Sequence, residues 1–285
     1  MGVNTATIID GLRELGLTSS SDVVVHGSLR SFGQVDGGAR SVIDGLSTVC
    51  RTMIMMAGSG DLTGLPAPPG LVRPDNAYYT AEDWESFDRQ VAEATAYRRD
   101  LPVDRWLGVL AETLRTTAGA VRGPHPLISF AALGDRADEL IAAESLVRPL
   151  GALEALVDSD GEVVLLGVDH SSNTTIHVAE QRLGRGLFHR YGRLADGLWA
   201  ELPNVSGESH HFDLIEPALR PYAREVMIGD CRARRFRARD VIAVTTELID
   251  SDPDALLCDA DGCRCAAARA QIRRAQIRRA QVRRA

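Results

Sequence analysis

Two histidines, an aspartate and a glutamate crowd into VDHSSNTTIHVAE, residues 168–180, directly after the apolar run EVVLLG. If Ser172 or Asn173 caps a helix after that run, His177 and Glu180 lie three residues apart on one helical face. A carboxylate beside an imidazole orients the ring and raises its basicity, which is the arrangement of a general base. The same spacing equally fits a core histidine satisfied by its neighbouring glutamate.

Asp169 and His170 precede that helix, at the carboxyl end of the expected strand, where α/β proteins place ligands. We therefore expect both residues to contact a ligand. Because His170, His177 and Glu180 are also metal-ligand types, a metal-dependent hydrolase is the competing hypothesis. The spacing H-x6-H-x2-E fixes no coordination geometry, unlike HExxH, so we expect no metal there.

A second polar segment is VVVHGSLRSFGQVDGG, residues 23–38. Ser28, Arg30 and Ser31 follow an expected buried strand and precede an expected helix. Their backbone amides and hydroxyls can meet phosphate or amide groups, and Arg30 can pair with an anion. A plain turn explains the segment equally well.

The third segment is HPLISFAALG, residues 125–134. A proline stands on either side of His125, which favours a rigid turn over a helix. Ser129 and Phe130 follow this turn. The composition of the segment fixes no reaction.

The elements that position these segments alternate between strands and helices, which predicts an α/β fold. Residues 58–80, rich in Gly and Pro, predict a long irregular excursion. An antiparallel strand pair is expected around LWAELPNV, and a helix around HHFDLIEPALRPYA. Buried strands are expected within residues 23–26, 51–58 and 162–167, and helices within residues 8–15, 39–50, 81–99, 105–121, 151–159, 174–184 and 240–252.

Charge is distributed unevenly along the chain. All 32 basic residues are arginine, and the formal net charge is −7. The last twenty residues hold seven arginines and no acid, which leaves 25 basic against 39 acidic residues in residues 1–265, a net charge of −14. An acidic body disfavours nucleic acid and favours polycationic partners. The five-residue repeat AQIRRAQIRRAQVRRA does not match the helical period, so residues 266–285 are interpreted as an appendage outside a single domain of residues 1–265.

The number of cysteines and the hydropathy of the chain indicate the cellular compartment in which we expect the protein. Five cysteines are too few for a disulfide scaffold, which fits a reducing compartment. The cluster CDADGCRC has neither a paired CxxC nor a nearby histidine, so its cysteines are interpreted as structural or incidental. Without an apolar run of membrane-spanning length or a signal-peptide pattern, we expect a cytoplasmic protein with no membrane contact.

Taken together, the three segments resemble the aminoglycoside 3-N-acetyltransferase family. Its members carry H-x-S-L-R-x-x-G-x-V-x-G-G, then H-P-x-x-S-x-A-A-x-G, then T-x-x-H-x-A-E. This chain has HGSLRSFGQVDGG at residues 26–38, HPLISFAALG at residues 125–134 and TTIHVAE at residues 174–180, in the same order. The resemblance runs from about Ile8 to Asp250 and leaves the arginine-rich end outside it.

The resemblance implies an α/β fold with a mixed central sheet flanked by helices, forming two lobes around a cleft. The implied reaction transfers acetyl from acetyl-coenzyme A to the 3-amino group of a 2-deoxystreptamine antibiotic, which gives resistance. His177 matches the family's general base and Glu180 its supporting carboxylate. The coenzyme loop is matched by Ser28, Leu29, Arg30, Ser31 and Gly33, with Ser129 and Phe130 on the other side of the coenzyme.

On the substrate side, Asp169 and His170 are expected to border the antibiotic, and Glu216 to line the cleft as an acidic residue. Some relatives acetylate other amines, so another small-molecule amine is an alternative acceptor. A binder that sequesters cationic ligands without catalysis is a third hypothesis. Both a monomer and a homodimer fit the sequence.

Overall fold

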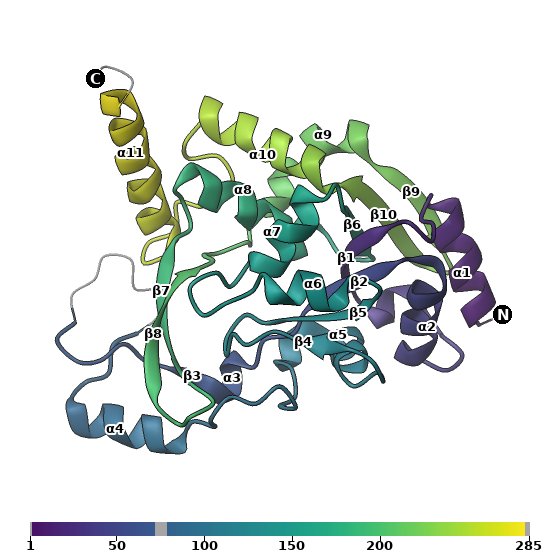
Figure 1. The fold of residues 1–285 in the computed structure, drawn as a ribbon. Coiled ribbons are helices and arrows are strands. Elements are labelled where there is room, and N and C mark those ends of the chain that lie inside the picture. Colours follow the sequence, from purple (N-terminus) through teal and green to yellow (C-terminus); the bar gives the residue numbers. More distant parts are fainter. Residues whose placement is uncertain (1, 72–78, 283–285) are drawn as a thin grey trace.

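The structure is a computed structural model and describes residues 2–71 and 79–282. Its centre is a seven-stranded sheet in the order β4-β5-β2-β1-β6-β10-β9 (Figure 1). β1 (Asp22–Gly27) is parallel to β2 (Thr52–Met56) and to β6 (Glu162–Leu166). The outer strands pair antiparallel and are β4 (Val121–Arg122), β5 (Phe130–Gly134), β10 (Cys231–Arg237) and β9 (Arg224–Ile228). The prediction of an α/β fold with a mixed central sheet is confirmed.

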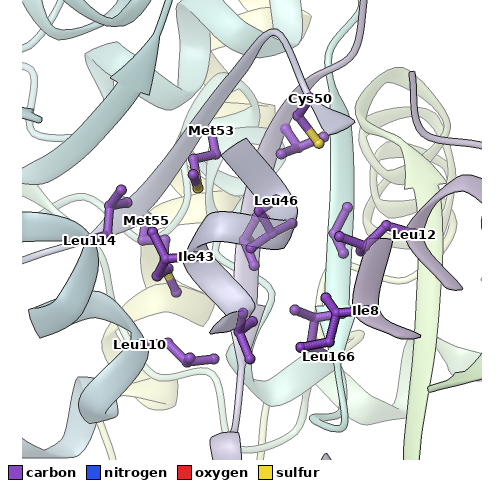
Figure 2. Packing of buried hydrophobic residues seen from close by; sticks show 14 of the residues in the cluster. Ile8, Leu12, Ile43, Leu46, Cys50, Met53, Met55, Leu110, Leu114 and Leu166 are labelled. Atoms are coloured by element: carbon purple, nitrogen blue, oxygen red, sulfur yellow. The ribbon is translucent and has the colours of Figure 1, made fainter. Parts of the chain in front are cut away.

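One face of the sheet is covered by three helices: α1 (Thr5–Glu14), α2 (Ala39–Val49) and α5 (Gly108–Arg115). Alternate side chains of a strand point to opposite faces, so Val23 and Val25 pack on this side and Val24 on the other. Figure 2 shows Leu46 of α2 among its apolar neighbours in this layer. Truncation of a fully buried leucine such as Leu46 to alanine costs about 2–5 kcal/mol.

The opposite face is covered by four helices: α6 (Ala137–Ala142), α7 (Gly151–Asp158), α8 (Thr175–Leu183) and α10 (Ala238–Ser251). Leu156 of α7 and Ile176 of α8 pack there against Val163 and Phe236 of the sheet. Because α8 is the first α-helix after β6, its buried face fixes the orientation of the residues that the sequence singles out.

A second, three-stranded antiparallel sheet lies beside the first (Figure 1), in the order β3-β7-β8. β7 and β8 form the expected antiparallel pair. The ring of Phe87 contacts Trp199 at 5.0 Å between centroids, which attaches a helix to this sheet. The expected excursion over residues 58–80 contains two short elements, and its residues 72–78 lie outside the described residues. The two short elements are α3 (Gly60–Thr63) and β3 (Gly64–Leu65). The other elements of this part of the molecule are α4 (Trp84–Glu93), which carries Phe87, β7 (Phe188–Arg193) and β8 (Trp199–Val205).

The helix expected around HHFDLIEPALRPYA is instead broken into three short turns. Pro217 and Pro221 lack a backbone N–H, so no long helix continues through them. The three turns are η4 (Phe212–Ile215), α9 (Glu216–Leu219) and η5 (Arg220–Tyr222). Three further 3-10 turns lie earlier in the described chain: η1 (Leu29–Phe32), η2 (Arg105–Leu107) and η3 (His170–Ser172).

The arginine-rich end forms α11 (Cys265–Val282), and its first half packs on the body. Ile272 is fully buried, and the Gln271 side chain exchanges hydrogen bonds with the backbone of Leu187 at 2.9 and 2.7 Å. Each five-residue repeat turns the helix by about 140° beyond a full turn, so the equivalent Ile277 of the next repeat is 59% exposed. The expectation of an appendage outside the fold therefore differs from the structure, in which the fold continues into α11.

Candidate active site

The three segments meet at one edge of the central sheet. β1 and β6 run parallel and end together, with Gly27 opposite Leu166. The backbone N–H of Ser28 donates to the Leu166 carbonyl at 3.0 Å, and the Ser31 hydroxyl donates to the Ser28 carbonyl at 2.7 Å. β5 begins at Phe130, opposite the end of β2. The carboxyl edge of the parallel strands is the usual ligand-binding edge of an α/β sheet.

His177 and Glu180 form a hydrogen-bonded pair on α8. Nδ1 of His177 lies 2.7 Å from Oε2 of Glu180, and the two side chains are 8% and 3% exposed. The imidazole also packs edge-on against Phe212, with ring centroids 4.7 Å apart. Because Nδ1 faces the carboxylate, Nε2 is the ring nitrogen left for a ligand.

The start of α8 sets the direction of this pair. α8 begins at Thr175, whose N–H donates to the Asn173 side-chain oxygen at 3.2 Å. The N-cap is Thr174, whose side chain makes no capping bond, so neither expected residue holds that position, although Asn173 does bond the first residue of the helix. The helical spacing then places His177 and Glu180 one turn apart on a buried face.

Arg185 is a third member of this group that the sequence motifs did not predict. Its Nε donates to Oε1 of Glu180 at 2.9 Å, and its Nη1 donates to the Pro253 carbonyl at 3.0 Å. The side chain is fully buried. Gly184 and Gly186 have φ of 87° and 72°, so the chain reverses after α8 and returns Arg185 to Glu180. The Gly-Arg-Gly sequence is the signal that could have found it.

The surroundings of Glu180 keep it ionised. Burial acts to raise the pKa of the carboxyl, since a charge is costly to bury. Hydrogen bonds and charges from His177 and Arg185 outweigh burial, and the pKa of Glu180 lies below its ordinary value. An ionised Glu180 accepts a hydrogen bond from an Nδ1–H of His177, which leaves the basic lone pair on Nε2.

His170 is fully buried, although it was expected to border the substrate. Its Nε2 lies 3.0 Å from Oε2 of Glu216, and its Nδ1 lies 3.2 Å from the Asn173 amide nitrogen. Burial, and then the charge of Arg234, lowers the pKa of His170 against the attraction of Glu216. Both ring nitrogens thus face polar groups inside the protein, and the ring has no exposed surface for a ligand.

Glu216 and Asp169 differ in what they can offer a cationic ligand. Glu216 accepts a hydrogen bond from Nη1 of Arg234 and lies 3.6 Å from Nη2 of Arg232, so its charge is largely compensated. Asp169 is exposed, and its Oδ1 accepts from the Ser171 N–H at 3.0 Å. Asp169 is therefore the more available of the two carboxylates.

Ser129 and Phe130 are fully buried as well. The Ser129 hydroxyl donates to the Ala57 carbonyl at 2.8 Å and accepts from Nε of Arg122 at 2.9 Å. Phe130 packs in the core between the sheet and α6. The expectation that these two side chains contact the coenzyme conflicts with their burial; they instead stabilise the turn of residues 125–130.

That turn is built on buried groups of unusual pKa. The Glu144 carboxyl accepts the backbone N–H groups of His125 at 3.0 Å and Phe130 at 2.9 Å, while Nδ1 of His125 accepts those of Leu127 and Ile128. Burial raises the pKa of Glu144 to about 8 and lowers the pKa of His125 to about 3. Both groups are neutral near pH 7, which suits a structural role.

The expected coenzyme loop presents its polar groups at the sheet edge. Arg30 is exposed, and Leu29 packs partly into the core, which anchors η1. Gly33 has φ of 74°, and a Cβ there would lie 2.5 Å from a carboxylate oxygen of Asp230, so glycine is needed to end η1. Ser28 and Ser31 are partly buried.

Metal-ligand residues gather elsewhere in the described part of the chain. Within residues 2–71 and 79–282, one set of at least three histidine, cysteine or acidic side chains has ligand atoms close enough together to share a metal ion. This set does not include His170, His177 or Glu180. The structure therefore does not support the competing hypothesis of a hydrolase metal at this site.

Fold and site together define an α/β protein with a hydrogen-bonded histidine–glutamate pair at the carboxyl edge of a mixed sheet. The family model of aminoglycoside 3-N-acetyltransferases matches residues 24–250. The chain is 31% identical to aminoglycoside N(3)-acetyltransferase IX of Micromonospora chalcea, over 84% of this chain and 87% of the relative.

Two solved structures share the fold. The YokD protein of Bacillus subtilis superposes with a TM-score of 0.77 at 24% identity, covering 89% of this chain and 95% of YokD. A substituted form of aminoglycoside acetyltransferase AAC(3)-IVa in complex with gentamicin superposes with a TM-score of 0.72 at 26% identity, covering 95% and 98% of the two chains.

The chain belongs to the aminoglycoside 3-N-acetyltransferase family. The predicted family, fold and enzyme class, an acyltransferase, are confirmed. Among the described residues, no helix has both the length and the apolar character to cross a membrane.

Proposed function

We propose that this chain transfers the acetyl group of acetyl-coenzyme A to the 3-amino group of a 2-deoxystreptamine aminoglycoside. The observation that carries the proposal is the His177–Glu180 pair, supported by Arg185, at the ligand-binding edge of the sheet. Family membership and the gentamicin-bound relative support this class of acceptor.

In the reaction, the aminoglycoside amine attacks in its neutral form. The nitrogen lone pair forms a bond to the thioester carbonyl carbon, and Nε2 of His177 takes a proton from that nitrogen. The tetrahedral oxyanion then collapses, the carbon–sulfur bond breaks, and the imidazolium returns the proton to the departing thiolate. The products are an N-acetyl amine and free coenzyme A, and no covalent acyl-enzyme is required.

Glu180 and Arg185 act on the base and not on the substrate. The carboxylate fixes which ring nitrogen is protonated and stabilises the imidazolium that forms. Because Arg185 binds the other carboxylate oxygen, Glu180 keeps its orientation and its negative charge. Both are positioning residues for His177.

For the coenzyme we retain the loop of residues 28–33 and not the side chains of Ser129 and Phe130. Arg30 is exposed at the edge where β1 ends, and its guanidinium suits a coenzyme phosphate. Ser28, Leu29, Ser31 and Gly33 form the turn that presents it.

For the acceptor, the acidic body and the exposed Asp169 favour a polycationic molecule. The net charge of −14 over residues 1–265 attracts cations at long range, and this attraction weakens as salt is added. Asp169 lies directly after β6, close in sequence to the base. A different small-molecule amine remains the second candidate, because the same charge and the same base serve any cationic amine.

Thiol release from acetyl-coenzyme A, measured with gentamicin, tobramycin, kanamycin and apramycin in turn, tests the proposal. We expect release with at least one of them, and NMR of the product should place the new acetyl group on the 3-amino nitrogen. Acetyl-coenzyme A that binds but yields no thiol with any of the four would overturn the aminoglycoside acceptor and favour another amine.

The same assay separates the other two hypotheses. A hydrolase would convert its substrate without acetyl-coenzyme A, whereas an acetyltransferase produces nothing without it. A non-catalytic binder would protect cells equally well with and without His177, whereas the proposed enzyme loses protection in His177→Ala.

A further inference from the structure

Three cysteines and a histidine from separate segments converge beside α11. Their ligand atoms all lie within 4.8 Å of one another, and we call them the Cys3His cluster: His210, Cys258, Cys263 and Cys265. The histidine lies between β8 and η4, two cysteines lie on the stretch after α10, and Cys265 is the first residue of α11. The cluster therefore joins parts of the chain that are distant in sequence.

The separations fit a tetrahedral metal site. At metal bond lengths of about 2.3 Å for sulfur and about 2.0 Å for nitrogen, tetrahedral ligand atoms lie about 3.5–3.8 Å apart. Because no two ligand atoms are more than 4.8 Å apart, movements of about 1 Å or less bring them to that separation. Three cysteines and one histidine are a common donor set of structural zinc sites.

Other roles explain the cluster less well. All five cysteines of the chain are free, and three thiols in one place leave one unpaired however they are joined. Cys258 and Cys265 do pack with Phe188, Leu257 and Ala268, as small apolar residues would. Apolar packing alone does not account for an imidazole nitrogen converging on three sulfur atoms.

The surroundings balance the charge of such a site. Three thiolates and one Zn²⁺ carry a net charge of −1. Arg264 lies between two of the cysteines in sequence, and Nη2 of Arg269 donates to the Cys258 carbonyl at 3.3 Å. Arg264 also bonds Glu208, close to His210 in sequence, which connects the same two segments a second time.

We propose that the Cys3His cluster binds one Zn²⁺ ion in a closed structural site. Four protein ligands leave no position for water or substrate, so the metal stabilises the fold and takes no part in the acyl transfer. This replaces the interpretation of the cysteines as incidental, which rested on the absence of a nearby histidine. His210 lies far upstream, and only the fold brings it to them.

The zinc site stabilises the two segments that contact His177 and Arg185. This inference rests on the proposed function, in which His177 is the base. Phe212 follows His210 by two residues, and its ring packs on His177. Pro253, which accepts the Arg185 hydrogen bond, begins the stretch that leads to Cys258. Gln271 of α11 bonds Leu187, two residues after Arg185. Zinc would thus fix both the segment that packs on His177 and the segment that binds Arg185.

Metal analysis of the full-length chain tests the site independently of activity. We expect about one zinc per chain in the purified protein, and after replacement by Co²⁺ the absorption of tetrahedral cobalt with thiolate charge-transfer bands. The His210 side chain is half-exposed, so it can be replaced without opening the core. The variant His210→Ala should lose zinc to a chelator at least about tenfold faster than the wild type, whereas the matched variant His211→Ala should lose it at the wild-type rate. A wild-type chain that takes up neither zinc nor cobalt would overturn the proposal.

Cysteine variants test which thiols bind. Cys263→Ser should abolish stoichiometric zinc, whereas Cys50→Ala, outside the cluster, should retain it. If Cys263→Ser fails to fold, the thiolate charge-transfer bands of the cobalt-loaded wild-type chain still show whether cysteines bind the metal. Zinc that persists undiminished in a folded Cys263→Ser would overturn this ligand set.

The link to the base is tested on wild-type enzyme with the zinc removed. We expect kcat to fall by at least about threefold with little change in the KM for acetyl-coenzyme A, and added zinc to restore it. An unchanged kcat in the zinc-free enzyme would overturn the positioning role. Failure of the proposed function looks different, because no variant or metal state would then release thiol.

Discussion

His170 and His177 stand seven residues apart, and each faces a glutamate. Nε2 of His170 lies 3.0 Å from Glu216, and Nδ1 of His177 lies 2.7 Å from Glu180. His170 has its second nitrogen against Asn173 and no exposed surface, whereas His177 keeps its second nitrogen for a ligand and is 8% exposed. A nearby carboxylate therefore does not by itself make a histidine a base.

The partners of the two carboxylates differ in the same way. Arg185 binds the oxygen of Glu180 that His177 does not use, so imidazole, carboxylate and arginine form one chain of interactions. Arg234 and His170 approach the same oxygen of Glu216, and Arg232 lies near the other. The first arrangement orients an imidazole, and the second neutralises a partly buried group of charges.

The largest expected effect comes from His177→Ala. We expect kcat to fall on the order of a hundredfold or more, because no other group takes the proton, while the affinity for acetyl-coenzyme A hardly changes. Steady-state thiol release and coenzyme titration measure the two quantities. Full activity in a folded variant would contradict the assignment of the base.

Glu180→Gln should come next. The amide keeps the shape but not the charge, so we expect kcat to fall about tenfold to a hundredfold. The change also leaves the Arg185 charge buried without a carboxylate, which should lower the free energy of unfolding by about 3 kcal/mol. Thiol release below the melting temperature and urea unfolding separate the two effects. A variant with reduced stability but wild-type kcat would show that Glu180 does not act on the base.

His170→Ala should affect stability more than turnover. The substitution leaves polar atoms of Glu216 and Asn173 without their imidazole partner, which costs about 1–3 kcal/mol. We expect kcat to stay within about threefold of the wild type. Urea unfolding and thiol release on the same preparation check both values. A loss of kcat as large as that of His177→Ala would remove the distinction between the two histidines.

A smaller effect is expected from pH, because other buried histidines resemble His170. Burial lowers the pKa of His26 to about 4 and of His125 to about 3, from 6.5 in the unfolded chain. The unfolded state binds more protons between these values, so these two groups lower the free energy of unfolding as pH falls from 6.5 to 4. Glu144, with its pKa raised to about 8, acts in the opposite direction.

The three groups together give a slope of about 1 kcal/mol per pH unit near pH 5.5. Urea unfolding at pH 6.5 and pH 5 measures it. A free energy of unfolding that is higher at pH 5 than at pH 6.5 would show that His26 and His125 are charged in the fold.

The sequence allowed the central elements to be predicted because their patterns are strong. Val23, Val24 and Val25 form an uninterrupted apolar run, which is typical of a strand buried on both faces, and α8 follows β6 as expected. β10 was not predicted, since its sequence CRARRFR looks like a solvated segment. In the structure it pairs with β6, and the buried Arg234 is compensated by Glu216.

The site was predictable only where its residues lie close in sequence. His177 and Glu180 share one helical turn, so spacing alone indicates their contact. Arg185 depends on a turn whose direction two glycines decide, and the partner of His170 lies on a different element. Contacts between distant segments depend on tertiary packing, which local patterns do not encode.

The most direct test of the oriented base is a double-mutant cycle on kcat with His177→Ala, Glu180→Gln and the double variant. If Glu180 acts only through His177, the double variant should turn over as fast as His177→Ala alone, because removing the base removes the effect of its carboxylate. Losses that multiply in the double variant would contradict the account, since they would show that the two side chains act independently.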